Sequence, residues 1–159
     1  MANYTKVFAH RPEVYAAWKN LSAAVQANMA LERYEVATIA AAQQRGSAYC
    51  GLAHARNLTP ELGVETVTQI ATGEDADPAR RAIYDLAHQV AAAPADITAD
   101  DLQPLRKLGF ADDEIMDVVL TAAIRCFFSS VLSTTGAEPD PSLTDQDPAL
   151  RGVFLSRHC

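Results

Sequence analysis

The sequence predicts an all-α protein: a single helical domain of six to seven helices over residues 1–159. Alanine, the best helix former and a poor strand former, occupies 30 of the 159 positions, whereas glycine occupies 7. Apolar residues recur at spacings of three and four, and no alternating strand pattern occurs. Because 49% of the residues are hydrophobic, one core can form without metals or disulfides. We expect this core over about residues 10–136 and an extended C-terminal tail over residues 137–159.

Four helices are predicted in the first half of the chain. The first begins at Pro12, a favoured first-turn residue, and the third begins after Ser47, a strong N-cap type. Gly46 ends the second helix, and Gly63 is a weak point within the fourth. The expected ranges are about 12–27, 31–45, 47–57 and 59–72.

Two shorter helices follow. Asp77 is a good N-cap and Pro78 favours the first helical position, so a helix begins there and ends before Pro94. A further short helix is predicted over residues 98–108, with Thr98 as its cap.

The longest predicted helix runs from Asp112 to about Thr135. Its middle, residues 118–132, is apolar on nearly all sides, with Arg125 as its one charge. Such a helix lies either at the centre of a fold or at a subunit interface, because large exposed apolar patches are rare on monomers. We therefore expect a homo-oligomer. We expect Arg125 to be a structural ion-pair partner, the alternative being a substrate clamp.

Composition excludes several classes of partner. The chain has 13 basic and 20 acidic residues and a net charge of -7, which disfavours binding to nucleic acid or to anionic membranes. We find no apolar run of membrane-spanning length and no signal-peptide pattern, and we expect a cytoplasmic protein. The three cysteines are odd in number and widely spaced, which is typical of free thiols.

One segment carries a pattern typical of thiol chemistry. If Ser47 caps a helix, Cys50 lies at the third helical position, where backbone N–H groups and the helix dipole stabilise a thiolate. His54 follows one turn later on the same face. A thiol with a base beside it, at the start of a helix, is an activated nucleophile.

Glu35 is a second candidate on the preceding helix. Its neighbours on that helix face are mostly apolar, and a buried carboxylate needs a partner. Because the turn at Gly46 and Ser47 folds the two helices against each other, Glu35 could approach the face that carries Cys50 and His54. A buried carboxylate there could serve as a proton shuttle.

These residues resemble the signature of the alkylhydroperoxidase D and carboxymuconolactone decarboxylase superfamily. The family pattern is Glu, eleven residues, Cys-x-x-Cys, three residues, His; here Glu35, Cys50 and His54 are in register, with Ser47 at the first cysteine position. The resemblance continues over residues 78–139, including "LRKLGFADDEI" and "GAEPD". It implies an all-helical fold and closed homo-oligomers, a trimer or hexamer, with active sites on or near subunit interfaces.

The resemblance also implies roles for individual residues. Cys50 matches the cysteine that attacks hydroperoxides, His54 the family's histidine and Glu35 its proton-relay glutamate. Ser47 stands where the resolving cysteine would be, so the family's local disulfide cannot form. We interpret Ser47 first as an N-cap and second as a hydrogen-bond relay. Tyr49 replaces a histidine of alkylhydroperoxidase D itself.

Three functional hypotheses follow. The leading one is a thiol-dependent alkyl hydroperoxidase, a peroxiredoxin-like antioxidant oxidoreductase in which Cys50 is activated by His54 and Glu35 and regenerated by an external thiol reductant. The second is cofactor-free acid–base lyase chemistry on a small carboxylate or lactone, as in the carboxymuconolactone decarboxylase branch. The third is a non-catalytic oligomeric scaffold.

No cofactor or metal is predicted, because nothing completes a ligand set around Cys50 and His54. We expect Cys126, within the apolar run, to be a core residue. Cys159 is a possible distant resolving thiol, although no local pattern supports that role.

Overall fold

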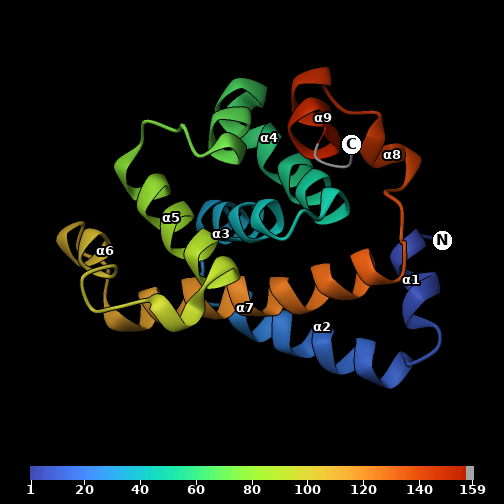
Figure 1. Cartoon of the computed structure of the whole chain (residues 1–159), viewed down its shortest axis with the longest axis horizontal. Helices are drawn as coiled ribbons and strands as arrows, with labels where there is room; N and C mark the ends of the chain where they lie inside the picture. The colour runs from blue at the N-terminus through green and yellow to red at the C-terminus, as the bar shows by residue number, and fades with distance from the viewer. Residues whose placement is uncertain (157–159) are drawn as a thin grey trace.

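A computed structural model describes residues 1–156 of the chain, and within them the all-α prediction is confirmed (Figure 1). This part of the chain contains nine α-helices and one short 3₁₀ turn, and no strand. The elements are α1 Asn3–Phe8, α2 Pro12–Gln26, α3 Leu31–Gln44, α4 Ala48–Thr72, α5 Pro78–Ala92, η1 Pro94–Asp96, α6 Gln103–Lys107, α7 Asp112–Thr134, α8 Pro141–Thr144 and α9 Pro148–Leu155. The expected six to seven helices were too few, because α1, α8 and α9 were not anticipated.

Helix α3 is the buried centre of the fold. It packs against α4, α5 and α7, and every residue from Tyr34 to Gln43 is buried. Four of these ten residues are alanines, and their small side chains let three neighbouring helices approach α3 closely. Glu35 is therefore carried into the interior by the most enclosed helix of the protein.

Helix α7 crosses the whole molecule, with α2 along one side of it (Figure 1). By length and mean hydropathy alone α7 could cross a membrane, which the sequence analysis did not anticipate. Core helices meet the same criteria, and 50% of its apolar window is buried within the fold. We interpret α7 as a bundle helix that is buried on the α3 side and carries the exposed residues Met116, Leu120 and Phe127 elsewhere.

Three predicted helices have other bounds in the structure. The expected helices over 47–57 and 59–72 lie in α4, which is two helical segments joined by a kink at Gly63, where φ is 80°, so the break lies at the predicted weak point rather than near residue 58. The predicted helix over 98–108 shortens to Gln103–Lys107, because Asp101 accepts hydrogen bonds from the backbone and hydroxyl of Thr98 and forms a turn there instead.

Within residues 137–156 the C-terminal tail contains two short helices, α8 and α9, where an extended segment was expected. Helices α8 and α9 pack against α4, and Gln146 donates to the backbone carbonyl of Leu52 at 3.0 Å. The ring of Phe154 lies where a Cβ on Gly51 would be, so only glycine at that position lets α9 approach α4 so closely. The tail thus supports the helix that carries the candidate nucleophile.

Candidate active site

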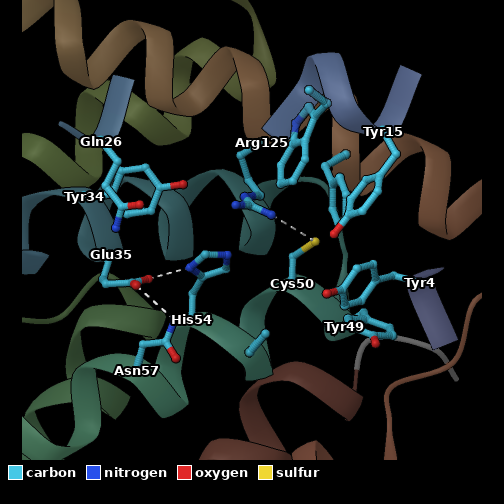
Figure 2. A pocket seen from close by; sticks show the side chains of 13 residues that line it. Tyr4, Tyr15, Gln26, Tyr34, Glu35, Tyr49, Cys50, His54, Asn57 and Arg125 are labelled. Atoms are coloured by element: carbon cyan, nitrogen blue, oxygen red, sulfur yellow. Dashed lines mark hydrogen bonds and ion pairs between the residues drawn. The ribbon is translucent and has the colours of Figure 1, made fainter. Parts of the chain in front are cut away.

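A cavity of about 240 Å³ lies where α1, α2, α3, α4 and α7 meet (Figure 2). Three of the four predicted site residues, Glu35, Cys50 and His54, line it. The other lining residues are Tyr4, Tyr15, Trp18, Gln26, Tyr34, Tyr49, Ala53, Asn57, Arg125 and Phe128. Residues far apart in the sequence therefore line one small cavity.

Cys50 occupies the third position of α4, as predicted. Its residue is 1% exposed, and its Sγ accepts a hydrogen bond from Arg125 Nη1 at 3.7 Å. This is the one hydrogen bond that the sulfur makes within residues 1–156. The guanidinium of Arg125 and the positive end of the α4 dipole therefore both lie beside this sulfur.

Ser47 is the N-cap of α4. Its hydroxyl accepts from the backbone N–H of Cys50, with an N–O distance of 3.5 Å, and it makes no side-chain hydrogen bond to Glu35 or to the Cys50 sulfur in the described residues. Ser47 does not line the cavity of Cys50; it lines a separate hollow on the Leu132 side. The contacts support the cap role and not the relay role.

Glu35 and His54 form a closely hydrogen-bonded pair. The distance from His54 Nδ1 to Glu35 Oε2 is 2.5 Å, and Asn57 donates to Glu35 Oε1 at 3.0 Å. Both oxygens of this carboxylate, whose residue is 1% exposed, therefore have partners. Figure 2 shows Glu35 and Asn57 on one side of the imidazole and Cys50 on the other. Asn57 is a member of the site that the sequence analysis missed.

The environment of His54 favours a neutral imidazole. Burial lowers the pKa of His54 and the positive charge of Arg125 lowers it further, while the hydrogen bond to Glu35 opposes both. With Nδ1–H donated to the carboxylate, Nε2 carries the lone pair. The pair is thus arranged as a base held in one tautomer by Glu35.

Arg125 does not form the structural ion pair expected from the sequence. It is 3% exposed, and no carboxylate lies within ion-pair distance of it in residues 1–156. Its Nε is buried with no hydrogen-bond partner, and its guanidinium lies near the rings of Trp18 and Phe128, at 5.9 and 5.5 Å from their centroids. The sequence signal for Arg125 was that it is the single charge in an apolar run. The alternative prediction, that Arg125 binds a substrate, agrees better with this geometry than a structural ion pair does.

Six aromatic side chains form much of the cavity wall: Tyr4, Tyr15, Trp18, Tyr34, Tyr49 and Phe128. Burial and the neighbouring Tyr4 raise the pKa of Tyr15 to about 12. Burial and the hydrogen bond to Asp140 also raise the pKa of Tyr49. Both phenols are therefore neutral at physiological pH and cannot balance the charge of Arg125.

The remaining cysteines lie apart from this cavity or outside the described residues. Cys126 is half-buried on α7, packs against the core and does not line the cavity, and burial raises the pKa of its thiol. Cys159 lies outside the described residues. Within residues 1–156 no group of three or more histidine, cysteine, aspartate or glutamate side chains has a metal-binding arrangement.

No family model and no curated protein matches the chain. Solved structures do. A peroxidase-related alkylhydroperoxidase AhpD core protein from Ralstonia eutropha aligns with a TM-score of 0.82 and 24% identity over 90% of this chain and 79% of that one. A peroxidase-related protein from a Silicibacter species aligns with a TM-score of 0.77 and 22% identity over 89% and 78%. The debrominase Bmp8, in complex with 2,3,4-tribromopyrrole, aligns with a TM-score of 0.74 and 14% identity over 94% and 79%.

These similarities establish the fold. The chain has the all-helical alkylhydroperoxidase D-like fold, as the sequence resemblance implied. The same fold carries proteins named as peroxidase-related and a protein named as a debrominase, so the chemistry of this chain has to be argued from its own cavity.

Proposed function

We propose that the protein is a thiol-dependent hydroperoxidase of the alkylhydroperoxidase D-like superfamily, with Cys50 as its nucleophile. The observation that carries this proposal is the placement of Cys50. Its sulfur is buried at the start of a helix, 3.7 Å from a guanidinium, in the cavity that also holds the Glu35–His54 pair. A nucleophile, a base and a group that orients the base are the elements of an activated thiol site.

The first steps follow from this arrangement. His54 Nε2 accepts the proton of the Cys50 thiol, through a water because no hydrogen bond joins the two side chains in the described residues. The thiolate attacks the outer oxygen of the hydroperoxide, the O–O bond breaks, and the sulfur becomes a sulfenic acid. The alkoxide leaving group takes the proton back from His54 and departs as the alcohol. Glu35 stabilises the imidazolium formed in between.

Regeneration requires a reductant from outside the site. Ser47 has no thiol, and Cys126 does not line the cavity. We propose that two external thiols reduce the sulfenic acid, returning Cys50 as a thiol and releasing water and a disulfide. A cytoplasmic location, expected from the sequence, would supply such thiols.

Turnover of an alkyl hydroperoxide with dithiothreitol as reductant tests this proposal. Wild-type protein should consume peroxide catalytically, Cys50→Ser should be inactive, and Cys126→Ser should match wild type. Activity that survives in Cys50→Ser would exclude Cys50 as the nucleophile.

A second candidate function is acid–base catalysis on a small carboxylate. The unpaired Arg125 beside the Glu35–His54 pair favours it, because a buried cation can hold a carboxylate while the pair moves a proton. In that case Cys50→Ser would keep the activity and Glu35→Gln would lose it. An unreactive Cys50 together with neither activity would favour the scaffold hypothesis.

We also propose that the protein is a homo-oligomer, a trimer or hexamer. Val14 and Leu21 of α2 and Phe127 of α7 are exposed large hydrophobic residues that line one shallow hollow with Ile124. Trp18 lines both this hollow and the active-site cavity. Light scattering at micromolar concentration should give a multiple of the chain mass; a monomer would contradict this proposal.

A further inference from the structure

Two side chains that line the cavity carry hydrogen-bond donors that no group within residues 1–156 accepts. Arg125 Nε and Trp18 Nε1 are both buried without a hydrogen-bond partner in the described residues, and both side chains line the cavity. Buried donors are nearly always paired in proteins, so an unmatched pair at one site needs an explanation. Because Arg125 also has no carboxylate partner here, a ligand that is anionic and only accepts hydrogen bonds would match this side of the cavity.

The aromatic side chains that line the cavity indicate the shape of the rest of the ligand. Trp18 lies face to face with Phe128, at 4.2 Å between ring centroids, and with Tyr15, and Tyr4 meets Tyr49 edge to face. A surface of aromatic rings favours a planar aromatic guest. A cavity of about 150 Å³ is known to hold benzene, so about 240 Å³ accommodates one ring with a small polar substituent.

We infer that the substrate is an aromatic peroxycarboxylic acid, whose ring lies among the aromatic side chains and whose carboxylate product is held by Arg125 and Trp18. This inference deepens the proposed function and rests on it for the role of Cys50. Arg125 contacts the sulfur at 3.7 Å, so its charge lies beside the place where the O–O bond would break.

The chemistry of the leaving group connects the substrate class to this arginine. The Cys50 thiolate attacks the outer peroxy oxygen, the O–O bond breaks, and Cys50 keeps the hydroxyl as sulfenic acid while a carboxylate leaves with the bonding electron pair. The sulfur is oxidised, the peroxy acid is reduced, and no further proton is needed. An alkoxide leaving group needs a proton, which arginine cannot provide; a carboxylate needs a fixed positive charge, which arginine does provide.

Binding of benzoate to the Cys50→Ser protein tests the recognition without any reaction. Trp18 is the one tryptophan of the chain, so its fluorescence reports directly on the cavity. We expect saturable binding of benzoate, and binding at least about tenfold weaker for benzamide, which lacks the charge, and for cyclohexanecarboxylate, which lacks the aromatic ring. Equal binding of benzoate and benzamide, or none of benzoate at millimolar concentration, would overturn the inference.

Substitution of Arg125 tests the reaction. The rates of Cys50 oxidation by peroxybenzoic acid and by cumene hydroperoxide are compared in wild type, Arg125→Met and the control Arg106→Met, whose arginine pairs with Asp112 at the surface. The ratio of the two rates cancels any general effect on the thiolate. It should fall about tenfold in Arg125→Met and stay constant in the control.

The outcomes distinguish failure of the peroxy acid assignment from failure of the proposed hydroperoxidase. An unchanged ratio with reactive Cys50 would refute the peroxy acid assignment and leave the proposed hydroperoxidase intact. Failure of both oxidants to modify Cys50 would refute the proposed function and the peroxy acid step together, while the benzoate series still decides the recognition. If Arg125→Met does not fold, the polar but uncharged Arg125→Gln replaces it, and the comparison of benzoate with benzamide needs no arginine variant.

Discussion

The two halves of the candidate site are built differently. In the proton-transfer half, Glu35 accepts from both His54 and Asn57, so each carboxylate oxygen has a partner. In the sulfur half, Cys50 and Arg125 meet at 3.7 Å, and Arg125 Nε has no partner in the described residues. The protein thus fixes Glu35 and His54, the proposed acid–base groups, with its own side chains and leaves Arg125 Nε without a partner in the described residues. This difference points to the Arg125 side of the cavity as the place where a ligand would supply a hydrogen-bond acceptor.

The largest effect should come from the proton-transfer half. In Glu35→Gln the shape of the side chain is kept, but the charge that stabilises the imidazolium of His54 is lost. We expect Cys50 oxidation to slow about 100-fold at neutral pH, within the range of general acid–base catalysis. Stopped-flow measurement against Glu65→Gln, an exposed control on α4, checks this; a loss smaller than about threefold would show that the pair is not used.

The sulfur half should respond more weakly. Removal of the guanidinium in Arg125→Met takes one charge-assisted hydrogen bond from the sulfur, so alkylation of Cys50 by iodoacetamide should slow about tenfold. The uncharged reagent makes this readout independent of anion binding. Arg106→Met should react like wild type, and an unchanged rate in Arg125→Met would mean that the 3.7 Å contact does not stabilise the thiolate.

A smaller effect, in pH dependence, links the two halves. The pKa of His54 is lowered below its usual 6.5, so the imidazole should stay neutral above pH 6.5. The rate of Cys50 oxidation should therefore be constant above pH 6.5 and fall only at lower pH, on the acid limb of the pH–rate profile. The groups facing the imidazole are Glu35, Arg125 and the ring of Tyr34. Arg125→Met removes one cause of the lowering and should move the acid limb to higher pH. A limb that moves down or stays would contradict the coupling.

The same pKa shift has a consequence for stability. Between the lowered pKa and 6.5, the unfolded state binds a proton at this histidine that the native state does not bind. Stability should therefore decrease as the pH falls through that window, and His54→Gln should remove this part of the dependence. Urea denaturation of wild type and of His54→Gln at a series of pH values measures the free energy of unfolding in each case.

The smallest effect is expected at Ser47, which lies outside the cavity. Ser47→Cys should form a disulfide with Cys50 on mild oxidation, with the loss of two hydrogens in mass, and should resist over-oxidation. Loss of the serine cap should cost about 1 kcal/mol of stability. A mixture of sulfenic and sulfinic acid in place of the disulfide would show that this turn cannot close the bridge.

The proton-transfer half could be predicted from the sequence because it is local. Glu35 and His54 lie 19 residues apart, on two helices joined by one tight turn, so helix periodicity and the caps indicated that their faces could approach, and the family resemblance supplied their register. The start of α4 at Ser47 and the third-position cysteine were predicted by the same local rules.

The sulfur half depends on contacts across the fold. Arg125 lies 75 residues from Cys50, and Asp140, which binds Tyr49, lies 91 residues away from it. No local pattern predicts which face of α7 meets α4. The tail is different, because Asp140–Pro141 and Asp147–Pro148 repeat the signal that correctly predicted the helix at Asp77–Pro78. These pairs were a readable sign of two short helices rather than of an extended tail.

The most direct test of the central claim is the mass of Cys50 after exposure to peroxide. Wild-type protein is treated with one equivalent of an alkyl hydroperoxide, trapped with a sulfenic-acid reagent, and analysed by intact mass and peptide mapping. We predict one reagent adduct, formed from the sulfenic acid with loss of water, on the peptide that carries Cys50, none on the peptide that carries Cys126, and no adduct in Cys50→Ser. A Cys50 that stays unmodified under excess peroxide would contradict the account and leave acid–base chemistry as the function of the cavity.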